Sequence, residues 1–203
     1  MTLYALKPAF QSLLRPRVTG LAQAGVTANQ VTLAAAAGSI VVGVLVAALS
    51  PARWPFLLVP VWLAARMALN AIDGMLAREH GQKSRLGAYL NEIGDVVSDV
   101  ALYAPFALIA AFGPHVMALV LFLAVLSEFV GVLGPMVGAA RRYDGPMGKS
   151  DRALVFGALG LWFGFGGPMP GWTVWIMAAV ALLLAATCVR RIRGGLEEGG
   201  MRP

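Results

Sequence analysis

Long apolar runs, separated by charged and turn-forming residues, constrain this fold more than any other feature of the sequence. The clearest covers residues 31–49 and contains no charged residue. A helix needs about 20 apolar residues to cross the hydrocarbon core of a membrane. With 59% hydrophobic residues, 13% charged residues and a mean hydropathy of +0.74, the chain of 203 residues is too apolar for a soluble domain. We therefore expect an all-α integral membrane protein.

Turn-forming residues divide the chain into six such runs, which predict six transmembrane helices. The runs cover approximately residues 31–49, 56–79, 86–112, 116–139, 153–166 and 172–189. Directly before the first run, Thr27 precedes Gln30 by three residues, which is the spacing of a capping box. The first membrane helix is therefore expected to begin at Thr27.

The N-terminal segment predicts an interfacial amphipathic helix rather than a further span. Four apolar residues share one helical face, and two prolines are expected to limit the length of the helix. These residues are Leu6, Phe10, Leu13 and Leu14, and the prolines are Pro8 and Pro16. The segment lacks the uninterrupted apolar core and the cleavage site of a signal peptide, so we expect it to be retained. The domain expectation is one membrane domain, with an interfacial segment 1–25, a six-helix bundle 26–190 and a cytoplasmic tail 191–203.

The basic residues are distributed as topology signals. Of the 16 Lys and Arg residues, 14 fall on one side of the six-helix arrangement, Arg53 lies on the other side, and Arg66 lies within the second run. The positive-inside rule places both termini on the cytoplasmic side, at the inner or plasma membrane if the protein is bacterial.

No basic patch with interleaved aromatic residues is visible, so the net charge of +6 does not indicate a nucleic-acid partner. Cys188 is the only cysteine, which excludes a disulfide framework.

Polar residues interrupt the second and third runs toward the same, cytoplasmic, membrane face. Asn70 and Asp73 are three residues apart and Asn91 and Asp95 are four apart, so each pair shares a helical face. Two carboxylates and two amide oxygens suit a hard cation such as Mg²⁺ or Mn²⁺, which usually serves phosphate chemistry. The plainer interpretation is that these groups pair internally, for instance Arg66 with Asn70 or Asp73, or emerge into water. Ionisable residues within a membrane are nevertheless functional candidates.

The segment from Asn70 to Asp95 resembles the signature of the CDP-alcohol phosphotransferases. It reads Asn-x2-Asp-Gly-x2-Ala-Arg-x8-Gly-x3-Asn-x3-Asp, and it keeps every spacing of the family pattern, in which both asparagines are aspartates. Residues 26–32 are similar to the start of the first helix in the family, and Gly148-Lys149 fits the basic loop before the fifth. The resemblance covers nearly the whole chain and implies six helices, cytoplasmic termini and a homodimer.

The resemblance also implies a reaction and assigns roles to residues. A metal-dependent enzyme would transfer a phosphoalcohol group from a CDP-alcohol, such as CDP-diacylglycerol, to an acceptor hydroxyl and release CMP in phospholipid synthesis. Asp95 would be catalytic and take the acceptor proton. The metal, Mg²⁺ or Mn²⁺, is expected on Asn70, Asp73, Asn91 and Asp95, and the CDP moiety on Gly74, Ala77, Arg78 and Gly87. Lys149 and Arg152 are candidates for binding the acceptor or its phosphate, or for ordinary attraction to membrane lipids.

Two departures from the signature leave the activity open. With Asn70 and Asn91 in place of aspartates, the formal charge of the four-residue metal set falls from −4 to −2, which weakens the attraction for two divalent ions. Glu92 and Asp99 are candidates to restore that charge. We expect a working but modified enzyme. The alternatives are a catalytically silent relative that binds nucleotide or lipid as a membrane subunit, and a transporter with an acidic path through the bundle.

Overall fold

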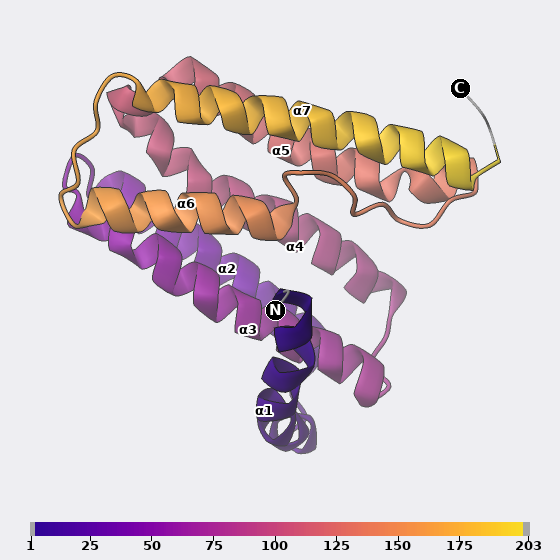
Figure 1. Cartoon of the computed structure of the whole chain (residues 1–203). Coiled ribbons are helices and arrows are strands. Elements are labelled where there is room, and N and C mark those ends of the chain that lie inside the picture. The colour runs from indigo at the N-terminus through magenta and orange to yellow at the C-terminus, as the bar shows by residue number, and fades with distance from the viewer. Residues whose placement is uncertain (1–2, 201–203) are drawn as a thin grey trace.

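The structure, a computed structural model, describes the backbone of residues 3–200 and the side chains of residues 10–200. Its α-helices are α1 (Leu3–Gln23), α2 (Ala28–Ala48), α3 (Leu58–Glu79), α4 (Arg85–Tyr103), α5 (Pro114–Val132), α6 (Lys149–Gly164) and α7 (Thr173–Glu198). Short 3-10 helices lie between them: η1 (Trp54–Leu57), η2 (Ala104–Leu108), η3 (Ala110–Phe112) and η4 (Gly134–Val137). Helices α2 to α7 form one elongated bundle, and α1 crosses it at a steep angle (Figure 1). Residues 3–200 contain no strand, which confirms the all-α class.

Four helical segments are long and apolar enough to cross a membrane. They are α2, the continuous stretch Trp54–Glu79 formed by η1 and α3, α5, and α7. Charged residues interrupt the apolar pattern of α4, and α6 has 16 residues, which is about 24 Å at 1.5 Å per residue. The chain is therefore an all-helical integral membrane protein with four candidate spans among its described residues.

Thr27 caps the first of these helices as its sequence predicts. Its side chain accepts a hydrogen bond from the main-chain N–H of Gln30 at 3.2 Å, and the Gln30 side chain accepts one from the N–H of Thr27 at 2.9 Å. This reciprocal pair satisfies two N–H groups that the helix itself leaves unpaired. The predicted capping box is confirmed.

Prolines end two helices earlier than predicted. The run over residues 86–112 is α-helical only to Tyr103 and continues as η2 and η3, and the run over residues 116–139 ends as α5 at Val132, before η4. Pro105 and Pro135 have no N–H to donate and crowd the preceding turn, so the α-helix does not continue through them. The expected ends at residues 112 and 139 are wrong.

The last helix is longer than predicted. α7 continues to Glu198 instead of ending near residue 189. Its basic residues do not terminate it, because Arg191 is buried and donates to the main-chain oxygen of Asp144 at 3.1 Å and to that of Ser127. Residues 191–198, expected in the tail, therefore continue α7.

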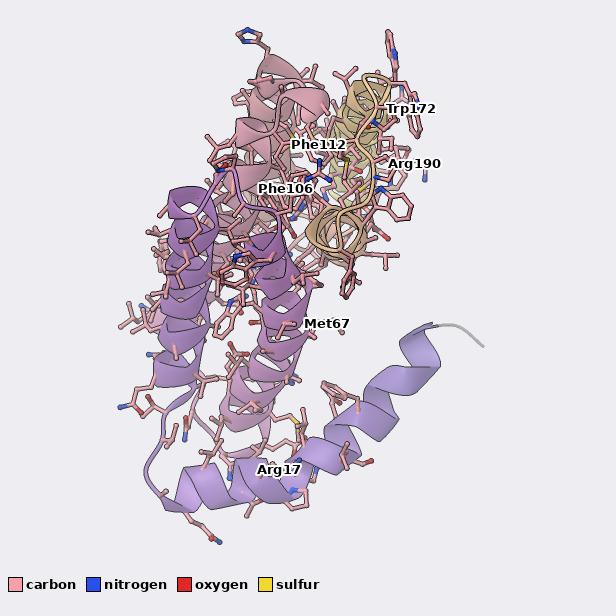
Figure 2. The ribbon with its side chains drawn as sticks, turned by 90° about the vertical axis from the view of Figure 1, so that its left-hand side faces the viewer. Arg17, Met67, Phe106, Phe112, Trp172 and Arg190 are labelled. Atoms are coloured by element: carbon pink, nitrogen blue, oxygen red, sulfur yellow. The ribbon has the colours of Figure 1, made fainter. Side chains whose placement is uncertain are left out.

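Helix α1 docks on the C-terminal half of α3. Leu14 and Val18 pack with Met75 in a small buried cluster, and the guanidinium of Arg15 donates two 3.0 Å hydrogen bonds to the carboxylate of Glu79. The two prolines do not shorten the helix as expected, since α1 runs over 21 residues, and this docking supports it from α3. Figure 2 shows α1, with Arg17, at the opposite end of the molecule from the aromatic core around Phe106 and Phe112.

Helix α2 packs along both α3 and α4. At Gly43 an added Cβ atom would lie 2.1 Å from the main-chain oxygen of Ala101 in α4. The added methyl group would overlap the main chain of α4, which cannot change rotamer as a side chain can. We therefore expect Gly43→Ala to lower the free energy of unfolding by about 2 kcal/mol, measured by denaturant titration in detergent. Gly94→Ala is the control, since its Cβ would meet only ordinary contacts of 3.6 Å or more. A loss of equal size in the control would contradict the close approach.

Candidate functional site

Helix α3 places one polar side chain of the signature in the interior. Asp73 is 6% exposed, and Oδ2 of its carboxylate accepts a 2.8 Å hydrogen bond from the hydroxyl of Thr32 in α2. Asn70 is half-buried one turn earlier. A Cβ on Gly74 would lie 2.8 Å from a guanidinium nitrogen of Arg78, so this exposed arginine folds back over the glycine. Gly74 and Arg78, both predicted to bind CDP, are thus adjacent on α3.

Helix α4 begins with the second half of the signature. The Ser84 side chain caps the helix by accepting a hydrogen bond from the N–H of Gly87 at 2.9 Å. A Cβ on Gly87 would lie 2.8 Å from the side-chain oxygen of Asn29, so this glycine lets the start of α4 approach the start of α2. Asn91 is exposed one turn later, and the side chain of Asp95 is 17% exposed.

A buried arginine bridges the two helices. Arg66 of α3 is 3% exposed and donates to Asp99 of α4 at 2.6 Å and to the carboxylate of Asp95 at 3.0 Å. The expected partners Asn70 and Asp73 are therefore wrong. Because α3 and α4 point in opposite directions, the middle of α3 lies level with Asp95 and Asp99. Two carboxylates also compensate the charge of the buried guanidinium better than a neutral amide would.

Helix α6 brings a second cation to Asp95. The ammonium of Lys149, at the first position of α6, donates to the same carboxylate oxygen of Asp95 as Arg66 does. Asp73 interacts electrostatically with both Asp95 and Lys149. The structure therefore brings Asp73, Asp95 and Lys149 together from three helices, although the sequence separates the outer two by 76 positions.

Arg152, the other acceptor candidate, contacts different carboxylates. It is 1% exposed, donates to Asp99 at 2.8 and 3.0 Å, and donates to Glu128 of α5 at 2.9 Å. Glu92 is paired with Arg141 in the loop before α6. Glu92 and Asp99 thus form ion pairs with arginines, so they do not restore the negative charge that the four proposed metal ligands lack.

The loop residue Arg141 stays charged in this environment. Burial of its guanidinium lowers its pKa, but the hydrogen bond with Glu92 and the charges of Glu92 and Glu128 raise it by more. The pKa of Arg141 therefore lies above its ordinary value. A charged arginine is consistent with its ion pairs to both carboxylates.

The donor chemistry fits a hard divalent cation. In the part of the chain with described side chains, no side-chain hydrogen bond engages Oδ1 of Asp73, Oδ2 of Asp95, or the amides of Asn70 and Asn91. Within the same residues, no group of three or more His, Cys, Asp or Glu is placed to hold a metal ion. The two asparagine oxygens would therefore have to complete a set built on two carboxylates.

Three contacts were not predictable as site features. Thr32 was notable only as the last residue of the segment at the start of the first helix, and nothing in the sequence pairs it with Asp73. The ion pairs of Asp95 with Arg66 and Lys149 join residues 29 and 54 positions apart. Helical periodicity shows which residues share one helix face, but it does not show which faces meet.

Comparisons with known proteins agree with the signature. The family model for CDP-alcohol phosphatidyltransferase matches residues 25–191. The chain is 48% identical to the inner membrane protein YnbA of Escherichia coli K12, over 97% of each chain. It is 29% identical to the phosphatidylinositol phosphate synthase of Mycolicibacterium smegmatis, over 97% of this chain and 90% of that one.

The fold is also that of a solved enzyme. The phosphatidylinositol phosphate synthase of Mycobacterium tuberculosis, in a crystal structure with CDP-DAG bound, superposes with a TM-score of 0.69 at 22% identity, over 89% of this chain and 92% of that one. A second structure of that synthase contains manganese and citrate. The signature, its placement on α3 and α4, and the match over residues 25–191 lead to one conclusion: this chain belongs to the CDP-alcohol phosphatidyltransferase family.

Proposed function

We propose that this chain transfers the phosphatidyl group of CDP-diacylglycerol (CDP-DAG), or the phosphoalcohol group of a similar CDP-alcohol, to an acceptor hydroxyl in phospholipid synthesis. The family supplies the reaction class, and the solved relative with CDP-DAG bound supports the donor. The acceptor oxygen forms a bond to the phosphatidyl phosphorus. The bond from that phosphorus to the bridging oxygen breaks, and CMP leaves with the electron pair.

Asp95 is the proposed catalytic residue that takes the acceptor proton. This role is supported by the proximity of Asp95 to Asp73 and Lys149, since all three lie where the two halves of the signature converge. Lys149 and Arg66 both donate to Oδ1 of Asp95, so Oδ2 of the same carboxylate is available for the acceptor proton. Arg66 remains bound to Asp95 and fixes its position from the buried side.

The donor nucleotide is proposed to lie along Gly74, Ala77, Arg78 and Gly87. Arg78 is exposed and has no ion pair among the described residues, so its planar guanidinium is free for a phosphate. Asn70, Asp73, Asn91 and Asp95 would hold Mg²⁺ or Mn²⁺, which neutralises charge on the diphosphate in this chemistry. The relative that contains manganese supports that choice.

The membrane arrangement of this proposal has six spans, with α4 and α6 added to the four candidate spans. Both helices belong to the bundle and lie beside helices that qualify (Figure 1). The excess of Lys and Arg at the end that carries the site supports cytoplasmic termini and a cytoplasmic site. Phe10 and Leu13 are exposed on α1, which suits a helix lying at the membrane interface, and membrane lipids would surround a homodimer.

The test is release of CMP by the purified protein in lipid and detergent micelles. CDP-DAG, Mn²⁺ or Mg²⁺ and a panel of alcohols should give CMP and a new phospholipid, both detected by mass spectrometry. No CMP above background with every acceptor would reject the proposal.

A silent binding subunit is the second candidate, because two features of the site weaken catalysis. Asn70 and Asn91 lower the negative charge of the metal set, and Lys149 neutralises Asp95. This candidate predicts that CDP-DAG raises the thermal midpoint while CMP release stays at background.

Restoring the family aspartates should strengthen metal binding. We expect Asn70→Asp with Asn91→Asp to lower the half-saturating Mn²⁺ concentration about tenfold, because ligand charge governs the affinity for divalent ions. The thermal midpoint of this double variant should fall in EDTA, where four carboxylates repel one another, and rise when Mn²⁺ is added. A midpoint that responds to Mn²⁺ no more than the unchanged protein would contradict the proposed metal set.

A further inference from the structure

The side chains around Asp95 restrict the charge of the acceptor. For proton transfer, the acceptor hydroxyl must come within hydrogen-bond reach of Asp95. The rest of a small acceptor then lies against the groups next to that carboxylate, on α4, α5, α6 and the loop before α6. A phosphate on the acceptor would need a cation there without a carboxylate partner.

Every cation in this part of the described chain already has such a partner. Ion pairs join five cations and four carboxylates in one network. The cations are Arg66, Arg141, Lys149, Arg152 and Arg191, and the carboxylates are Glu92, Asp95, Asp99 and Glu128. Asp73 makes no ion pair with a described residue but interacts electrostatically with Asp95 and Lys149, and with it the formal charge of the group is zero. An added phosphate would have to displace a carboxylate and leave it buried and unpaired.

Glu128 holds the centre of the network. One carboxylate oxygen lies 2.9 Å from a guanidinium nitrogen of Arg152, and the other lies 3.2 Å from Arg141 and 3.5 Å from Arg191. Three guanidinium groups from a loop and two helices therefore surround one carboxylate, which is the arrangement that would otherwise bind a phosphate. The Glu128 side chain is 8% exposed, so the pairing is not screened by water.

The remaining donors of Arg152 and Arg191 are also engaged, whereas the buried Nε of Arg141 has no hydrogen-bond partner among the described residues. Arg152 uses its other nitrogens on Asp99 and on the hydroxyl of Ser127, at 3.0 and 3.3 Å. Arg191 donates to main-chain oxygens of Ser127 and Asp144. Arg152 and Arg191 therefore hold α5, α6 and α7 together, and these donors are already used within the protein.

We propose that the acceptor of this chain is an uncharged polyol or other neutral alcohol, and that the Glu128 carboxylate excludes phosphorylated acceptors by occupying the arginine cluster. This inference rests on the proposed function and names its acceptor class. The transfer leaves the acceptor as a phosphodiester headgroup without a second phosphate. In this respect the chain differs from its relatives named phosphatidylinositol phosphate synthases.

The first experiment compares matched acceptors in the CMP-release assay. Glycerol is set against glycerol 3-phosphate, and myo-inositol against inositol 1-phosphate. At least one neutral acceptor should have a kcat/KM roughly 100-fold above its phosphorylated partner, because a site with no unpaired cation rejects an added phosphate. A preference for the phosphorylated partner would overturn the inference but leave the proposed function intact.

The second experiment needs no turnover, so it decides the role of Glu128 even if no acceptor gives CMP. Inositol 1-phosphate should leave the thermal midpoint of the unchanged protein where it is and raise that of Glu128→Gln. Glu92→Gln, at a more exposed position, tests the same cluster with less risk of unfolding and should respond in the same direction. The control Glu79→Gln frees only Arg15 on α1 and should show no response. A response of the unchanged protein, or none in both cluster variants, would overturn the inference.

Discussion

Asp95→Ala should lower the rate of CMP release about 1,000-fold. General-base catalysis contributes roughly 100- to 10,000-fold, and Asp95 is also a proposed metal ligand, so both roles are lost together. Folding should be less affected, because Arg66 keeps its 2.6 Å hydrogen bond to Asp99 when Asp95 is removed. The rate is measured at saturating CDP-DAG and Mn²⁺, with the thermal midpoint as a check on folding.

Two further variants separate the roles of this carboxylate. Asp95→Asn keeps an oxygen that can accept from Arg66 but cannot take a proton, and it should be nearly as inactive as Asp95→Ala. Lys149→Met removes the cation that neutralises Asp95, so the rate should not fall as it does in the two Asp95 variants. If Asp95→Asn kept a tenth or more of the rate, the proposed base would be a different group.

The ends of a helix were predictable where a local sequence signal marks them. The Thr27–Gln30 capping box starts α2, and its two hydrogen bonds depend on residues three apart. The break at Pro105 was missed because hydropathy continues through the proline, while the missing N–H ends the α-helix there. The extension of α7 was missed because Arg191 looked like a basic residue in a tail, and only the fold gives it buried partners.

The candidate site was predictable along each helix but not between helices. Asn70 and Asp73 share a face of α3, and Asn91 and Asp95 share one of α4, which follows from the helical repeat. The partner of Arg66 depends on the relative depth of α3 and α4 in the bundle, where both pack against α2. Sequence reasoning therefore placed the candidate residues on shared helix faces and missed the carboxylates with which Arg66 pairs.

Asp99→Asn should lower the free energy of unfolding by about 3 kcal/mol, because it removes a buried counter-charge from two buried arginines, each of which keeps one other carboxylate. Asp99 is 4% exposed and accepts from Arg66 of α3 and from Arg152 of α6, both of which are almost fully buried. The asparagine keeps the size of the side chain, so the loss reports the charge rather than a cavity. Denaturant titration in detergent measures it.

The matched control is Glu79→Gln, the same acid-to-amide change at an exposed ion pair. Arg15 and Glu79 form two hydrogen bonds of 3.0 Å, yet their side chains are 52% and 36% exposed, so water solvates both charges when the pair is broken. No resolvable change in stability is expected there. If both variants lost the same free energy, the interior of this bundle would be as well hydrated as its surface, and the Glu128 carboxylate could not exclude a phosphate from its arginines.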